Sequence, residues 1–167
     1  MSIDAIRAPF LMEGAIRHAI HRLKYGNLRA IAPILGGLLA DYMSSEGLSG
    51  DALVPVPLHP KREHQRGYNQ AKLLARESGK LLDIAVDSRL LTRVSNAPPQ
   101  ARSQSSIDRK ANVRDSFSCQ NPSRIEGRTL ILLDDVCTTG ATLDACATAL
   151  KEAGAARVYG VTLAREA

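Results

Sequence analysis

The sequence contains no tryptophan, and only 4% of its 167 residues are aromatic. So few rings count against a surface on which the bases of single-stranded nucleic acid would stack. Hydrophobic residues nevertheless make up 44% of the chain, which indicates an aliphatic α/β interior. The length suits one domain with a substantial core.

Cysteine is scarce as well. The three residues, Cys119, Cys137 and Cys146, are an odd number without C-x-x-C spacing, which argues against a disulfide framework or a zinc site. They are typical of reduced thiols, so we expect a cytoplasmic protein. No apolar run approaches membrane-spanning length and no signal-peptide core is evident, so no membrane insertion is expected.

The net charge of +5 is unevenly distributed. Residues 59–66 carry a net +2 and residues 89–114 a net +5, so the rest of the chain carries −2. The positive excess therefore lies in two short segments. Such concentration favours a polyanionic ligand over a uniformly basic surface.

The most informative stretch is TLILLDDVCTTGATL, residues 129–143. Thr129 to Leu133 predict a short buried parallel strand that stops at Asp134 and Asp135. A loop of small residues follows at 138–142, and an apolar helical pattern then runs toward a stop at Gly154. The order strand, acids, threonine–glycine turn and helix is therefore well defined.

That order is typical of a phosphate-binding site. The free amides and dipole of a helix N-terminus attract an anion, Gly140 permits close backbone approach, and threonine hydroxyls add donors. Asp134 and Asp135 cannot serve the phosphate, but they could accept hydrogen bonds from vicinal sugar hydroxyls or hold a divalent cation. The alternative is an ordinary βα unit with an acidic, threonine-rich loop.

A second unit of this type precedes it. Residues 52–57 predict a strand, residues 58–67 a loop, and residues 68–82 a helix. The loop carries Lys61, Arg62 and Arg66, which suit a diphosphate. The alternative is a solvated charged turn.

The other segments are read from periodicity and breakers. Residues 1–10 are expected to be irregular; residues 13–24 and 28–43 predict helices, with Pro33 in the first turn of the second or kinking it. His18 and His21 are interpreted as polar-face or capping residues. Further strands are predicted at 84–91, 113–118 and 157–163.

Residues 92–112 show almost no apolar periodicity. A long irregular loop is uncommon in a compact domain unless it covers or binds something. We interpret it as a flexible lid, with Arg102, Arg109 and Arg114 as candidate contacts, that would shield a reacting glycosyl centre from water. A disordered surface insertion is the alternative.

Alternating strands and helices predict an α/β fold: a doubly wound, mostly parallel sheet with helices on both faces. We expect an N-terminal helical segment, 1–46, packed on a single compact unit, 47–167. Ligands of such sheets bind beyond the carboxyl ends of the strands, where both loops would lie.

The stretch LILLDDVCTTGATL resembles the 5-phosphoribosyl-1-pyrophosphate (PRPP) motif of the type I phosphoribosyltransferases. The resemblance implies that two acids hold the ribose hydroxyls and that the turn wraps the 5-phosphate. It also implies Mg²⁺ bound with PRPP, with no metal site made by the protein alone. The implied phosphate and ribose contacts are Asp134, Asp135, Val136, Cys137, Thr138, Thr139, Gly140, Ala141 and Thr142; the implied diphosphate contacts are Lys61, Arg62 and Arg66.

Three more segments narrow the resemblance: PFLMEGAIRHAIHRLKYGN, HQRGYNQAKLLA and PQARSQSSIDRKANVRDSF. Together they resemble the ComF competence-protein branch of that superfamily, over nearly the whole chain. Members usually begin with a four-cysteine zinc-binding segment; this sequence contains none, so no zinc role is implied.

The ComF resemblance implies a role in DNA uptake during natural competence, or in the use of DNA as a nutrient. The chemistry implied is transfer of a phosphoribosyl group, with PRPP or a nucleotide as ligand. No residue suggests itself as a general base, so the acceptor stays open. The alternative is a non-catalytic module on the same fold that binds single-stranded DNA or competence proteins through its basic loops, by salt-sensitive electrostatics.

Overall fold

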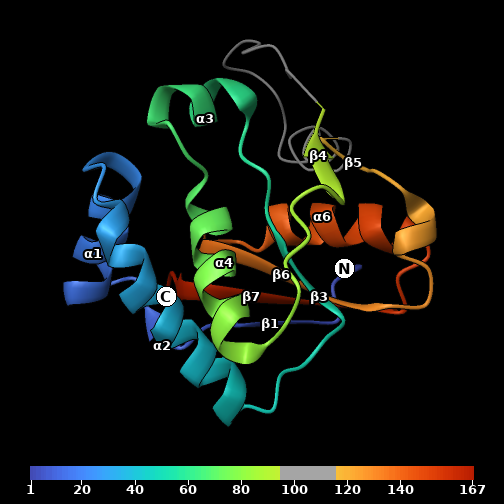
Figure 1. The fold of residues 1–167 in the computed structure, drawn as a ribbon, viewed down its shortest axis with the longest axis horizontal. Coiled ribbons are helices and arrows are strands. Elements are labelled where there is room, and N and C mark those ends of the chain that lie inside the picture. Colours follow the sequence, from blue (N-terminus) through green and yellow to red (C-terminus); the bar gives the residue numbers. More distant parts are fainter. Residues whose placement is uncertain (95–115) are drawn as a thin grey trace.

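The central sheet consists of parallel strands (Figure 1), in a computed structural model that describes residues 1–94 and 116–167. Its order is β1–β7–β6–β3, and β2 also pairs with β7. The strands are β1 (Ala5–Arg7), β2 (Phe10–Leu11), β3 (Ala52–Pro55), β6 (Thr129–Cys137) and β7 (Arg157–Arg165). A separate antiparallel pair joins β4 (Leu91–Arg93) to β5 (Phe117–Cys119).

Helices cover both faces of the sheet, which confirms the predicted α/β class (Figure 1). Helix α6 lies on one face, and α2 and α4 pack against each other on the opposite face beside α1. Pro33 lies in the first turn of α2, as predicted. The helices are α1 (Gly14–Tyr25), α2 (Ala32–Ser45), α3 (Pro60–Arg66), α4 (Gln70–Leu82) and α6 (Ala141–Glu152), with short 3₁₀ turns at Arg29–Ile31 and Pro122–Arg124.

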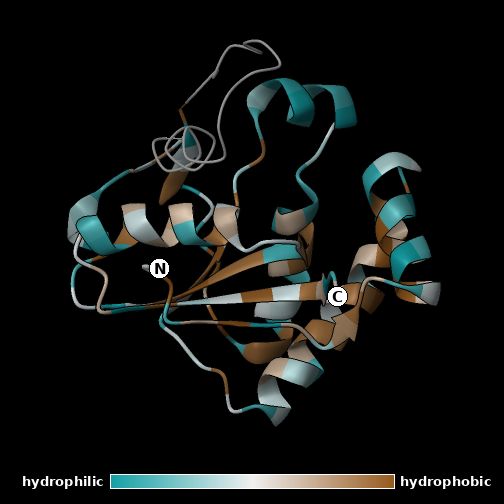
Figure 2. Cartoon of the chain, turned by 180° about the vertical axis from the view of Figure 1, so that it is seen from behind, coloured by the Kyte–Doolittle hydropathy of each residue, from teal (hydrophilic) through white to brown (hydrophobic). Residues whose placement is uncertain are grey.

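Strand β6 is buried on both faces because it lies between β3 and β7 under helices on either side. Its side chains alternate between two apolar clusters. Leu130 and Leu132 pack in the cluster of α6, whereas Ile131 and Leu133 pack in the cluster of α2 and α4. Figure 2 shows the hydrophobic strands between more polar helix surfaces.

The N-terminus is not the irregular lead-in that was expected. β1 pairs with β7 in parallel register, with Ala5 opposite Tyr159, and Phe10 pairs with Ala164. A short edge strand that packs only a few side chains has little periodicity of its own, so its partner decides its structure. Residues 1–46 therefore contribute strands to the sheet as well as helices.

The strand predicted at 84–91 is also wrong. Only Val86 forms a bridge, with Leu53, and the chain becomes regular again at β4. The strand predicted at 113–118 overlaps β5, which covers Phe117–Cys119, and the first three residues of that prediction lie outside the described residues. No helix in the described parts of the chain has the length and apolar character needed to cross a membrane.

Candidate functional site

The two predicted binding segments meet at one edge of the sheet. β3 and β6 are adjacent and parallel, with Pro55 opposite Leu133, so the chain leaves both strands on the same side. β3 leads into α3, and β6 leads through the threonine–glycine turn into α6. This carboxyl edge is where ligands of open α/β sheets bind.

The threonine–glycine turn depends on Gly140. This residue has φ +78°, a left-handed conformation that favours glycine. A Cβ placed there would lie 3.0 Å from the Ile6 Cδ1 atom, so β1 supports the turn from behind. Thr138 and Thr139 are exposed in front of it, and the Thr139 hydroxyl accepts the Ala141 amide at 3.3 Å. The first-turn amides of α6 are thus positioned beside exposed hydroxyls, as an anion site requires.

The flanking residues of the motif have other surroundings. Val136 and Cys137 are the last residues of β6 and are half-buried, so the predicted stop at the acids is wrong: the strand continues through both. Burial raises the pKa of the Cys137 thiol. Ala141 and Thr142 open α6, and Asp144 one turn on accepts the amides of Ser2 and Ile3 at 2.6 and 3.1 Å.

Because the strand continues, Asp134 and Asp135 project to opposite faces of the sheet. Asp134 is partly exposed on the α6 face, and its carboxylate accepts the Asp135 amide at 2.8 Å. Burial, with the negative charge of Asp135 second, raises the pKa of Asp134 well above its usual range. Asp134 is therefore largely buried, but it retains partial solvent access near the carboxyl edge of the sheet.

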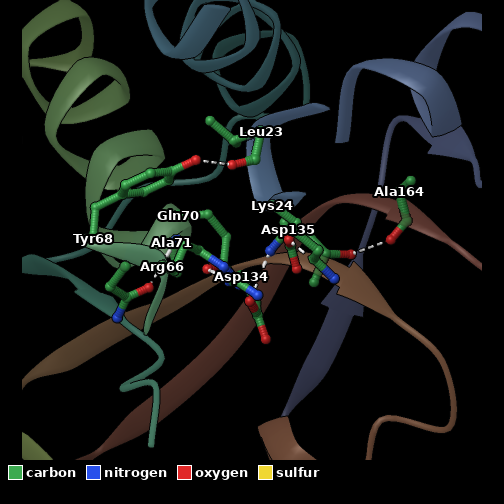
Figure 3. Close-up of polar contacts among 11 residues, drawn as sticks. Leu23, Lys24, Arg66, Tyr68, Gln70, Ala71, Asp134, Asp135 and Ala164 are labelled. Atoms are coloured by element: carbon green, nitrogen blue, oxygen red, sulfur yellow. Dashed lines mark hydrogen bonds and ion pairs between the residues drawn. The ribbon is translucent and has the colours of Figure 1, made fainter. Parts of the chain in front are cut away.

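Asp135 points the other way and is only 2% exposed. Its Oδ2 atom lies 3.2 Å from the Nζ atom of Lys24, at the end of α1 (Figure 3). The pattern of adjacent acids does not reveal this difference. Asp135 forms an internal ion pair, and only Asp134 retains partial solvent access.

The first basic segment is a helix and not the predicted loop. His59 caps it by accepting the Lys61 amide at 3.1 Å, Pro60 occupies its first turn, and Gly67 ends it at φ +86°. This start and stop chemistry is ordinary for a short helix, but the apolar periodicity that predicts helices is missing, because no residue of α3 is buried. Figure 2 shows how polar α3 is.

A cleft of about 620 Å³ lies between α3 and the end of α1. Arg62 and Arg66 line it, whereas Lys61 does not. Arg66 donates to the Gln70 side chain, and its guanidinium lies 5.5 Å from the centre of the Tyr25 ring. The other lining residues are Lys24, Tyr25, Asn27, Gln65 and Tyr68.

The sequence interpretation did not identify Lys24 and Tyr25 as residues of the candidate site. Lys24 falls on the same helical stripe as Ile20 and Leu23, both fully buried, and a lysine in such a stripe signals a buried partner. Tyr25 is 69% exposed and carries no pattern of its own. His18 and His21 are exposed on the polar face of α1, as predicted. The lid candidates Arg102, Arg109 and Arg114 lie outside the described residues.

Comparison with known families places the chain in a protein family. The model of the phosphoribosyl transferase domain matches residues 25–167. The chain belongs to this family. The match begins at Tyr25, one residue after the lysine that pairs with Asp135, and it includes α3 and the threonine–glycine turn.

Curated relatives confirm the resemblance to the ComF branch. The chain is 34% identical to Competence protein F of Haemophilus influenzae, over 87% of this chain and 66% of that protein. It is 33% identical to DNA utilization protein YhgH of Escherichia coli, over 87% and 65%, and 34% identical to Competence protein ComFC of Bacillus subtilis, over 95% and 63%. The chain thus spans slightly less than two thirds of the length of these relatives.

Among solved structures, the chain is similar to the glutamine phosphoribosylpyrophosphate amidotransferase of B. subtilis complexed with ADP and GMP. The TM-score is 0.54 and the identity 21%, over 80% of this chain and 26% of that one. At this identity the likeness concerns the fold.

Proposed function

We propose that the chain binds PRPP, or the 5-phosphate of a nucleotide, at the carboxyl edge of β6 and transfers the phosphoribosyl group to an acceptor. The observation that carries the proposal is the left-handed turn at Gly140, which presents the α6 amides beside the exposed Thr138 and Thr139 and the partly exposed Asp134. The amides and hydroxyls would hold the 5-phosphate, and Asp134 would accept from a ribose hydroxyl.

The cleft beside α3 would hold the diphosphate through Arg62 and Arg66. Displacement at the anomeric carbon breaks the bond to the diphosphate, which leaves with the electron pair, and forms a bond to the acceptor. Positioning and stabilisation of charge on the leaving group are the contributions expected of the protein. The relatives named for competence and DNA utilization suggest that this reaction serves DNA uptake or DNA use as a nutrient, and three free cysteines support a cytoplasmic location.

Mg²⁺ fits this site as a companion of the diphosphate. Asp134 offers a carboxylate oxygen, the ligand type that Mg²⁺ prefers, and phosphate oxygens would complete its coordination. Residues 1–94 and 116–167 contain no group of three or more potential metal-ligating side chains. When bound, the ion would neutralise charge on the diphosphate.

Calorimetric titration with PRPP and Mg²⁺ tests the proposal. Asp134→Asn should weaken binding about tenfold, the loss of roughly 1.4 kcal/mol expected for one charged hydrogen bond to the sugar. Asp41→Asn, which removes an exposed carboxylate on α2, is the matched control and should leave affinity unchanged. Wild type that does not bind PRPP, or an Asp134→Asn variant that binds it equally well, would refute the proposal.

A second candidate function, single-stranded DNA binding, is favoured by Tyr25. This exposed ring lies under the Arg66 guanidinium beside a basic cleft, the combination that stacks and neutralises a nucleotide strand. Anisotropy of a labelled oligonucleotide at several salt concentrations tests it. Tyr25→Ala should weaken binding at every salt concentration, whereas equal affinity would exclude this use of the ring.

A further inference from the structure

Lys24 stands between a buried acid and the cleft beside α3. Its ammonium lies 3.2 Å from Asp135, whose side chain is 3% exposed, while the Lys24 side chain is 23% exposed. Lys24 is also one of the residues that line the cleft. Lys24 therefore both pairs with Asp135 (Figure 3) and contributes to the lining of the cleft.

The backbone next to Lys24 is held firmly. The Tyr68 hydroxyl donates to the carbonyl oxygen of the preceding residue, Leu23, which is fully buried. The guanidinium of Arg29 lies 4.6 Å from the centre of the Tyr68 ring. Tyr68 lies two residues after the end of α3, so its hydrogen bond to Leu23 ties the end of α1 to the segment that supplies Arg62 and Arg66.

The lining of the cleft is cationic. It contains Lys24, Arg62 and Arg66, and its other side chains are neutral. Three cations converging on one cleft suit an anion with several charges. An ammonium has three donors, so an ion pair with Asp135 leaves donors for oxygen atoms of such an anion.

We propose that Lys24 is a shared counter-ion, held by Asp135 in the unliganded protein and recruited by a diphosphate group in the cleft. The inference rests on the proposed function in taking a diphosphate as the ligand. It adds Lys24 of α1 to Arg62 and Arg66 of α3 as a cation for the diphosphate. It also means that Asp135 weakens binding of that anion. The Asp135 carboxylate competes with the diphosphate for the Lys24 ammonium, and its negative charge opposes binding of the anion.

This arrangement predicts opposite effects for the two partners. With inorganic pyrophosphate as the probe, Lys24→Met should lower affinity about tenfold, and Lys24→Arg should restore most of it. Asp135→Asn should raise affinity about threefold, because Lys24 no longer has a competing anion. The double variant should resemble Lys24→Met. Were Lys24 only a structural prop, Asp135→Asn would not tighten pyrophosphate binding.

Calorimetry with pyrophosphate on the full chain is the test, and circular dichroism checks that each variant is folded. Lys80→Met is the matched control, because Lys80 pairs with Glu77 at 3.4 Å on α4 and does not line the cleft. If Lys24→Met fails to fold, the Asp135→Asn variant and the double variant, which buries no lone charge, still decide the matter. Unchanged or weaker pyrophosphate binding by Asp135→Asn overturns the inference.

A parallel titration with ribose 5-phosphate separates this inference from the proposed function. That ligand has no diphosphate and would occupy only the threonine–glycine turn and Asp134. Absence of ribose 5-phosphate binding would count against the proposed function, whatever pyrophosphate does. Normal ribose 5-phosphate binding with the wrong sign for Asp135→Asn would count against the role of Lys24 alone.

Discussion

Asp134 and Asp135 are chemically identical neighbours with different surroundings. The alternation of a strand turns one toward α6 and the edge of the site and the other toward Lys24. One carboxylate is thus left to meet a ligand, and the other has an internal counter-ion. A role for the pair cannot be assigned to both residues equally.

The raised pKa of Asp134 predicts that this residue destabilises the folded protein once its carboxyl group is ionised. Between the unfolded value of about 3.9 and the higher folded value, the native state binds more protons, so the free energy of unfolding falls as pH rises through this window. Asp134→Asn should remove this loss and stabilise the protein at pH 7 by about 1 kcal/mol. Urea denaturation from pH 4 to pH 8 measures it. A variant that is less stable at pH 7 would contradict the argument.

Removal of the Lys24 ammonium, by contrast, should destabilise the protein. Lys24→Met leaves the buried Asp135 carboxylate without its cation and should cost about 2 kcal/mol at pH 7, less than for a fully buried pair because Lys24 keeps some solvent contact. Lys24→Met combined with Asp135→Asn should recover most of this loss. Thermal unfolding of the two single variants and the double variant gives the coupling; additive losses would exclude it.

At the scale of elements, the prediction succeeds where the signal is local. β3, β6, α2, α4 and α6 follow from apolar periodicity and from glycine and proline signals. It fails where a distant partner decides: β1 forms because β7 offers an edge, and α3 has caps but no apolar stripe. For the site, the residues of the turn and the basic segment could be named, but not the opposite orientation of the acids or the approach of Lys24.

The turn before α6 gives a prediction of its own. Gly140→Ala should destabilise the protein by about 2 kcal/mol, because it adds left-handed strain and a Cβ 3.0 Å from Ile6, and it should abolish ribose 5-phosphate binding. Gly127→Ala isolates the strain: φ is +71° there, with nothing within 4 Å of the added Cβ. Equal unfolding free energies and equal ligand binding in the two variants would rule out support of the turn by β1.

The contact of Tyr68, between α3 and α4, with the end of α1 gives another prediction. Tyr68→Phe deprives the buried Leu23 carbonyl of its donor and should cost about 1 kcal/mol. It should also weaken pyrophosphate binding severalfold, because the end of α1 carries Lys24 into the cleft. Tyr42→Phe, on α2 and outside the lining of the cleft, is the control for loss of a hydroxyl. An unfolding curve and a pyrophosphate titration that match wild type would show that the junction tolerates the loss.

At the scale of the whole molecule, the N-terminal residues complete both the sheet and the site. Asp4 accepts the Val158 amide at 2.7 Å and pairs with Lys151 at 2.9 Å, while Ser2 and Ile3 bind Asp144 on α6. Deleting residues 2–7 would uncover the edge of β7. We expect a lower melting temperature and concentration-dependent association, measured by light scattering. A monomeric, equally stable product would refute this.

The pairing of β1 with β7 also bears on how the chain is made. Ala5 faces Tyr159, so β1 cannot pair in the sheet until β7 has been synthesised. β7 lies between β1 and β6, and neither neighbour can be joined to the other without it. The sheet therefore stays incomplete until β7 is available, and its closure is a step of high contact order.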